Sequence, residues 1–183
     1  MITVDEFKLL DDVQCGRVIA AGLASRDYRG GRMKDSDGQD YVAPNIRQSS
    51  VAFLEPEELG DIATILREKA EHLNDQVFKA ELSGKVQYQF ASYEGSKGDF
   101  IAWHADEPLW DNKWRGKKVS MCTQLSDPVN YDGGVFEIRE RPPTRRGLGL
   151  TVAFPSFIWH RVTPVTRGWR FAIVTWLHGA HWR

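Results

Sequence analysis

The sequence predicts an α+β protein built on a jelly-roll, cupin-like double sheet that is preceded by supporting helices. Two helical patterns come first, and after them the chain changes to short β-like runs separated by Gly, Pro and Asp turns. Seven such runs within about ninety residues are typical of a sandwich or small barrel, and two helices can cover one sheet face. The runs are 86–93, 100–106, 119–126, 134–139, 148–154, 158–163 and 169–177.

The first helix is expected behind the acidic pair Asp11 and Asp12, because acidic side chains suit a helix N-terminus. The apolar residues that recur there at helical spacing are Leu9, Val13, Ala20 and Leu23. From 27 to 45 the chain is rich in Gly, Asp and Arg without any period, which predicts a long loop. That loop is either plain surface or a lid over a substrate.

Pro56 begins the second predicted helix, since proline suits a first helical position. Its apolar stripe, interpreted as core, consists of Ile62, Leu66, Leu73 and Val77.

Length and composition limit the classes of protein that remain. The 183 residues fit one domain, 1–183, in which 1–85 supports a β-core at 86–178. The net charge of -1 lacks the basic excess that non-specific nucleic-acid binding needs. Cys15 and Cys122 are too few for a disulfide scaffold or a thiolate zinc site. Without a secretory signal or an apolar run near the about 18 residues of a membrane span, we expect a cytoplasmic protein with no nucleic-acid or membrane partner.

A first candidate site lies in the run Phe-Ile-Ala-Trp-His-Ala-Asp, which ends in His104 and Asp106. Residues two apart in a strand point to the same face, so the imidazole and the carboxylate can converge on one ion. Alone this signal is weak, because five His and many Asp in a chain of this length make a chance His-x-Asp common.

His160 strengthens the signal, since it lies 56 residues downstream on a different predicted strand. Two His and one Asp form the facial triad that holds Fe(II) and leaves open positions. A zinc hydrolase is disfavoured because no His-Glu-x-x-His is present. The competing interpretation of His160 is a buried histidine bonded to the backbone.

Arg170 follows His160 by ten residues and begins the next predicted strand. Its guanidinium can therefore enter the same cavity and offer a bidentate fork to a carboxylate. A site that binds only a metal has no need of this cation, whereas a dicarboxylic 2-oxo acid that chelates iron at one end does. A surface salt bridge is the alternative, and it would also suit Arg161 and Arg167.

Three segments together resemble a known family: His104-x-Asp106, Tyr131-Asp-Gly-Gly134, and the stretch from His160 through Arg-Val-Thr-Pro-Val-Thr-Arg-Gly-Trp to Arg170. They are similar to the 2-oxoglutarate- and Fe(II)-dependent oxygenases of the prolyl 4-hydroxylase-like group, especially bacterial PKHD-type hydroxylases. The resemblance implies a double-stranded β-helix, iron on His104, Asp106 and His160, and Arg170 on the distal carboxylate of 2-oxoglutarate.

The same resemblance suggests further contacts to the co-substrate. Tyr93 lies close to where relatives have a tyrosine that hydrogen-bonds it, and Cys122 and Gln124 share a strand face that the resemblance turns toward it. Trp176 is six residues after Arg170, on the same face, and is expected to line the cavity.

The implied function is that of a dioxygenase that hydroxylates a C–H bond of a peptide or small molecule, with a prolyl residue or a free amino acid as the expected target. Its cofactors would be Fe(II), with 2-oxoglutarate and O₂ as co-substrates and ascorbate as a reductant, and it would release succinate and CO₂. Two alternatives are a nucleic-acid demethylase of the same chemistry, which the neutral charge disfavours, and a non-catalytic jelly-roll module with a relic metal site. The relic is disfavoured because all four site residues are present.

Overall fold

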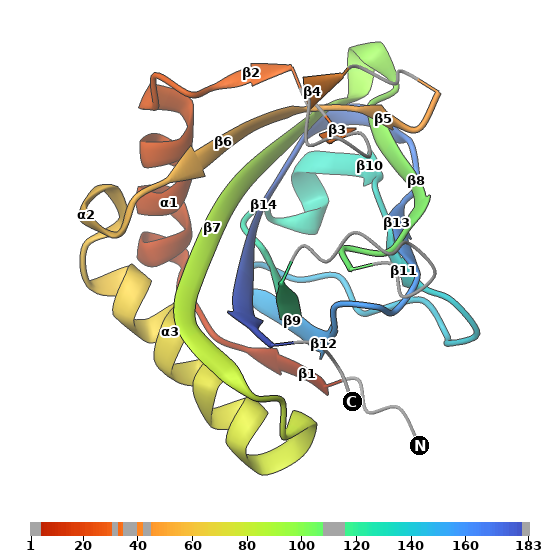
Figure 1. Ribbon diagram of the computed structural model, residues 1–183. Coiled ribbons are helices and arrows are strands. Elements are labelled where there is room, and N and C mark those ends of the chain that lie inside the picture. The colour runs from red at the N-terminus through yellow and green to blue at the C-terminus, as the bar shows by residue number, and fades with distance from the viewer. Residues whose placement is uncertain (1–4, 31–32, 35–39, 42–44, 108–115, 181–183) are drawn as a thin grey trace.

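The computed structural model describes residues 5–30, 33–34, 40–41, 45–107 and 116–180. It shows two antiparallel sheets that face each other, with helices on the outer side of the larger sheet (Figure 1). The predicted jelly-roll architecture, a double-stranded β-helix with supporting helices, is confirmed. No helix within these described residues is long and apolar enough to cross a membrane.

The larger sheet carries most of the chain. Its strand order is β1-β12-β9-β14-β7-β6-β2, and β10 pairs with β14. These strands are β1 (Asp5–Lys8), β12 (Leu150–Pro155), β9 (Lys117–Gln124), β14 (Val165–Gly179), β7 (Leu82–Glu94), β6 (Ser50–Leu54), β2 (Arg29–Gly30) and β10 (Tyr131–Gly133).

The smaller sheet has the order β11-β13-β8-β5, so β5 is an edge strand. It consists of β11 (Phe136–Ile138), β13 (His160–Val162), β8 (Phe100–His104) and β5 (Arg47–Gln48). Residues 27–45, expected as a loop, contain β2 and the short pair β3 (Met33–Lys34) and β4 (Asp40–Tyr41), while 31–32, 35–39 and 42–44 lie outside the described residues. The hypothesis of a lid in this segment therefore stays a prediction.

Helix α1 (Asp12–Ala24) begins where predicted, with Asp11 as its N-cap and a reciprocal capping box with Gln14. The predicted apolar face was wrong, however, because Val13 and Leu23 are exposed. The buried residues are instead Cys15, Val18 and Gly22. A side chain at Gly22 would overlap the ring of Phe90 on β7, so close packing on the sheet, rather than hydrophobic periodicity, selects the buried face.

The second predicted helix is interrupted at Gly60, whose φ of +59° disfavours other residues. The result is the short helix α2 (Pro56–Leu59) followed by α3 (Asp61–Leu73) and a π-helical turn, Asn74–Phe78. Most of the predicted stripe is core, but Val77 lies in that turn and is exposed.

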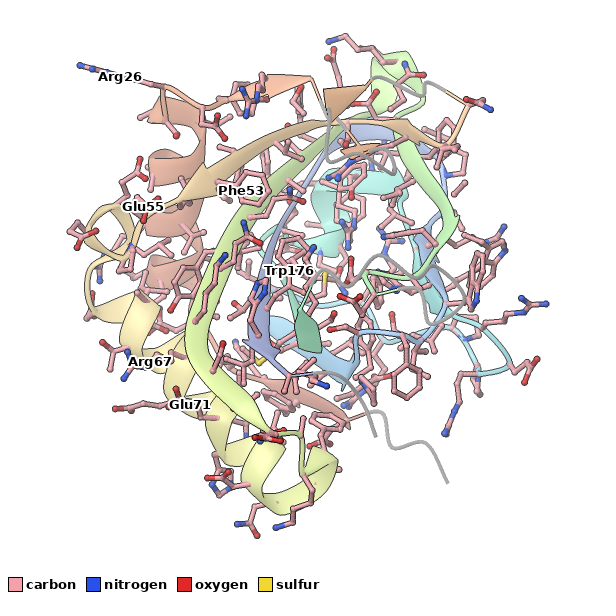
Figure 2. All side chains as sticks on the ribbon, in the orientation of Figure 1. Arg26, Phe53, Glu55, Arg67, Glu71 and Trp176 are labelled. Atoms are coloured by element: carbon pink, nitrogen blue, oxygen red, sulfur yellow. The ribbon has the colours of Figure 1, made fainter. Side chains whose placement is uncertain are left out.

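The two faces of the large sheet contribute to different cores, because side chains alternate along each strand. One core packs the sheet against α1 and α3, and Phe90 and Met121 belong to it. The other fills the space between the sheets, and it combines Tyr93 and Cys122 of the large sheet with Val162 of the small one. The inter-sheet side chains surround the candidate site. Figure 2 shows Trp176 in the middle of the molecule, with Arg67 and Glu71 on the outer, helical side.

Candidate active site

The three predicted ligand residues come from separate parts of the small sheet. His104 ends β8, His160 begins β13, and the two are directly opposite each other in the strand pairing. The pairing slips between this pair and Ile101–Val162, which leaves one extra residue on β8. Asp106 lies in a bend just after β8, not in the strand as predicted. The bend, rather than strand alternation, therefore brings its carboxylate beside His104.

The three side chains converge closely enough to share one ion. Asp106 Oδ1 is 3.8 Å from His104 Nε2, and Asp106 Oδ2 is 3.6 Å from His160 Nε2. All three ligand atoms lie within 4.8 Å of one another. Metal bonds of about 2.1 Å place two ligand atoms of one ion about 3.0 to 4.2 Å apart. These side chains would therefore move very little on binding an ion. The predicted third ligand is thus adjacent to the first two.

Both histidines are oriented by backbone carbonyls. His104 Nδ1 lies 3.0 Å from the Ala102 carbonyl oxygen, and His160 Nδ1 lies 2.9 Å from that of Ile158. A carbonyl oxygen can only accept, so each Nδ1 carries a proton and each ring directs its Nε2 away from the carbonyl. This tautomer presents Nε2 to a metal, and the hydrogen bond that fixes it is the usual outer support of a metal-binding histidine. The alternative of a backbone-bonded His160 is therefore compatible with ligation.

Two donors orient the carboxylate of Asp106. The Trp176 indole Nε1–H and the Ser120 hydroxyl both donate to Oδ2, at 2.9 and 2.7 Å. Ser120 and Trp176 are directly opposite each other on β9 and β14, so a single cross-strand pair supplies both donors. Ser156 Oγ lies 2.9 Å from Ser120 Oγ and extends this network. The sequence analysis assigned no role to Ser120, although strand alternation places it on the same face of β9 as Cys122 and Gln124.

Burial and charge keep the ligands in the forms that bind metal. Burial, followed by the charge of His160, lowers the pKa of His104 to about 3, so this imidazole is neutral near pH 7. Burial alone would raise the pKa of Asp106, but His160, Lys117, His104 and the hydrogen bond from Trp176 hold it well below its usual range. Metal binding requires such a neutral imidazole and a charged carboxylate. The His104 side chain remains 19% exposed, which leaves this side of the site open to solvent.

Arg170 on β14 is a buried cation, with only 1% of its surface exposed. Among the described residues, no oxygen or nitrogen atom accepts a hydrogen bond from any of its three guanidinium nitrogens, and the neighbouring side chain is the Cys122 thiol. The guanidinium carbon lies 5.2 Å from the centre of the Tyr93 ring. A buried charge without a partner is costly, so this environment calls for an anion, which none of the described residues supplies.

The remaining predicted residues have different surroundings. Burial raises the pKa of the Cys122 thiol, although the adjacent Arg170 guanidinium opposes this rise, so Cys122 lies beside Arg170. Both ends of the Gln124 side-chain amide form hydrogen bonds within the protein. Its Oε1 accepts from the Tyr131 hydroxyl, and its Nε2 donates to the Arg145 carbonyl. Trp176 contacts Asp106, as described above. Contacts of these side chains with a co-substrate stay predictions.

A family model for the 2OG-Fe(II) oxygenase superfamily matches residues 88–178, the segment that contains His104, Asp106, His160 and Arg170. The chain belongs to the 2OG-Fe(II) oxygenase superfamily. The donor set of this oxygenase fits the metal, since two histidines and one carboxylate with open positions are typical of non-haem Fe(II) sites. The unpartnered Arg170 likewise fits the carboxylate of 2-oxoglutarate.

Similar sequences are named PKHD-type hydroxylases. One from Hyphomonas neptunium is 38% identical over 90 residues, which are 46% of this chain and 40% of that relative. One from Synechococcus sp. is 30% identical over 155 residues, which are 82% of this chain and 66% of that relative. One from Shewanella frigidimarina is 42% identical over 62 residues, which are 32% of this chain and 27% of that relative. The oxygenase chain thus matches less than two thirds of the length of each of these relatives.

Solved structures of prolyl hydroxylases share the fold. The enzyme from Trichoplax adhaerens, in complex with a hypoxia inducible factor peptide fragment, has a TM-score of 0.75 at 18% identity and covers 96% of this chain and 83% of its own. A Pseudomonas putida prolyl-4-hydroxylase has a TM-score of 0.72 at 19% identity, and the match covers 99% of this chain and 95% of that enzyme. A viral collagen prolyl hydroxylase from Paramecium Bursaria Chlorella virus-1, in its 2OG complex, has a TM-score of 0.73 at 15% identity. That match covers 97% of this chain and 96% of the viral enzyme. At these identities the likeness establishes the double-stranded β-helix.

Proposed function

We propose that this chain is a 2-oxoglutarate- and Fe(II)-dependent dioxygenase that hydroxylates a C–H bond, with a prolyl residue or a free amino acid as substrate. The observation that carries the proposal is a single inter-sheet interior that contains both a preoriented His-Asp-His triad and a buried arginine without an acceptor among the described residues. A metal site alone needs no such arginine, whereas a chelating dicarboxylate needs both parts.

The residues have separate roles in this proposal. His104, Asp106 and His160 would coordinate Fe(II), which supplies the redox chemistry for O₂ once it is bound. Arg170 would bind the distal carboxylate of 2-oxoglutarate with two N–H groups. The aromatic rings of Phe136 and Phe154, at 5.5 and 4.8 Å from the His160 ring centre, pack around that ligand and keep water from its inner side.

Three further side chains complete the proposed interior. Tyr93 is buried next to Arg170, and no described residue forms a hydrogen bond with its hydroxyl, so the hydroxyl is available to the co-substrate. Cys122 would form part of the pocket wall beside the distal carboxylate. Trp176 would act by holding Asp106 in position.

The stoichiometry of the proposed reaction balances. One oxygen atom of O₂ enters the substrate C–H bond as a hydroxyl group, and the other enters succinate, while the 1-carboxyl of 2-oxoglutarate leaves as CO₂. Ascorbate as a reductant and a cytoplasmic location belong to the same proposal. The hydroxylation is supported by the name of the similar sequences, and a prolyl substrate by the name of the Pseudomonas putida prolyl-4-hydroxylase that shares the fold.

Succinate formation tests the proposal. The purified chain is incubated with Fe(II), 2-oxoglutarate and O₂, with and without proline, other free amino acids and proline-containing peptides. We expect succinate that depends on Fe(II), rises with at least one of these substrates, and is matched by a hydroxylated product in mass spectrometry. Asp106→Ala provides the control, because it removes a ligand and should abolish succinate. Equal succinate from this variant, or none from the native chain with any substrate, would contradict the proposal.

A further inference from the structure

Arg47 is a second cation that faces the inter-sheet space. It lies on the edge strand β5 directly opposite Ile101 of β8, and residues directly opposite in an antiparallel pair share a face. Ile101 belongs to the core between the sheets, so Arg47 points the same way. Its side chain reaches across to the large sheet, where Nη2 lies 3.3 Å from Gln89 Oε1 on β7.

The acceptors of Arg47 are neutral. Nε donates to the Ser49 hydroxyl at 2.8 Å, and Nη2 donates to the Gln89 amide oxygen. No carboxylate of the described residues lies within ion-pair distance of this guanidinium. Arg161 on the neighbouring strand β13 shows the usual arrangement, since its Nε lies 2.6 Å from Glu137 Oε2. The acceptors of Arg47 among the described residues are thus uncharged, and they leave the positive charge of its guanidinium without a counterion from that part of the chain.

Arg47 also acts electrostatically on the site. Burial raises the pKa of Tyr93, and Arg47 opposes this rise more strongly than Arg170 does. Arg47 also contributes to the lowered pKa of His104, although less than burial and His160 do. Its positive charge is therefore felt at the Tyr93 hydroxyl and at a metal ligand.

The two interior arginines differ in depth. Arg170 is almost completely buried on a central strand, whereas Arg47 is only partly buried on an edge strand. A small co-substrate that binds first can reach the deeper cation, and the outer cation remains for a molecule that enters afterwards.

We propose that Arg47 binds a carboxylate of the primary substrate and so selects anionic substrates for this oxygenase. The inference rests on the proposed function. The carboxylate can be the α-carboxylate of a free amino acid or an acidic side chain beside the target residue in a peptide. Phe53 on β6, labelled in Figure 2, lies directly opposite Gln89 and is 36% exposed, so it offers an apolar surface next to this cation.

Paired probes test the proposal and distinguish the two sources of the carboxylate. Succinate formation is measured for two pairs of probes. The first pair is L-proline and L-prolinamide. The second pair is an acetylated peptide amide with Asp next to Pro and the same peptide with Asn in place of Asp. Charge-assisted hydrogen bonds predict a KM lower by roughly ten- to a hundred-fold for the anionic member of at least one pair. A preference within the first pair identifies an α-carboxylate, and one within the second identifies an acidic side chain.

Substitution then assigns the preference to Arg47. Arg47→Gln should abolish the preference for the anionic probe, and Arg47→Lys should retain part of it. Arg161→Gln is the matched control, because it removes an arginine of the same sheet whose guanidinium lies beside Trp103 and Glu137 instead. This variant should retain the full preference.

Binding without turnover separates this inference from the proposed function. Calorimetry with L-proline or the Asp peptide, in the absence of O₂, should show affinity that falls at least ten-fold in Arg47→Gln but not in Arg161→Gln. Such a loss supports the role of Arg47 even if no succinate forms, in which case the proposed function alone fails. The inference is overturned if native protein prefers neither anionic probe in turnover or binding, or if Arg47→Gln keeps the preference.

Discussion

Replacing Arg170 by alanine should weaken 2-oxoglutarate without disturbing the metal site. All three guanidinium nitrogens lack an acceptor among the described residues, so the native side chain can give both oxygens of a carboxylate a donor. A hydrogen bond to a charged group contributes about 1.5 to 3 kcal/mol, or roughly ten- to a hundred-fold in affinity. We therefore expect the apparent constant for 2-oxoglutarate to rise by at least that factor.

The assay measures 2-oxoglutarate binding by calorimetry with Mn(II) in place of oxidisable iron, beside Mn(II) binding alone. Metal binding should stay near the native value, because Arg170 contacts none of the three ligands. Thermal denaturation gives a second readout, since a ligand that binds only the folded state raises the Tm. Saturating 2-oxoglutarate should raise the Tm of the native chain more than that of Arg170→Ala. Arg170→Lys should fall between the two, because a point charge replaces a bidentate fork.

Arg167 provides the internal control. Its side chain is 59% exposed and its Nε lies 2.6 Å from Asp132 Oδ2, so it has a partner and faces solvent. Arg167→Ala should leave 2-oxoglutarate binding unchanged. Loss of binding in this variant with a silent Arg170→Ala would show that the motif is misaligned by three residues. If neither variant alters binding, the assignment of 2-oxoglutarate itself is refuted.

Three other outcomes follow from the site and its surroundings. Trp176→Phe removes one of the two donors to Asp106 and should weaken Mn(II) binding about ten-fold, which calorimetry can measure; native affinity would argue against this positioning role. Gly134→Ala should lower both the Tm and 2-oxoglutarate affinity, because φ is +59° there and a Cβ would lie 2.7 Å from Arg170 Cδ. Burial raises the pKa of Cys15 to about 11, against an ordinary 9.0, so its thiolate fraction at pH 8 is about 100-fold lower. Mass spectrometry can measure the rate at which Cys15 is alkylated. This rate should be low in the native protein, increase toward pH 11 and become high on unfolding. Rapid labelling of the native protein would contradict the burial of Cys15.

The sequence by itself determined which residue types gather in the interior. The spacings within the pairs His104–Asp106 and His160–Arg170, two and ten residues, are local patterns, so each can be recognised before the fold is known. Strand alternation likewise placed Cys122 and Gln124 on one face, because the period of two is a property of each strand alone. The seven β-like runs predicted the jelly-roll, and these motifs predicted the three ligand residues that the structure brings together.

Predictions failed where neighbouring elements determine the local structure. The buried face of α1 depends on how Gly22 packs against Phe90 of a distant strand, and hydrophobic periodicity contains no information about that contact. Strand β6, which was not predicted, is buried on both faces at Val51 and Ala52, so it shows no alternation of apolar and polar residues.

The tertiary structure alone decided how the site is supported. Ser120 and Trp176 are 56 residues apart, yet their cross-strand pairing directs both donors to the carboxylate of Asp106. Arg47 precedes the β-core predicted from sequence, and only the pairing of β5 with β8 turns it toward the interior. Such contacts depend on the register between strands, and a shift of one residue would move each side chain to the opposite face. Register is set by the packing of the whole double sheet, which no single segment encodes.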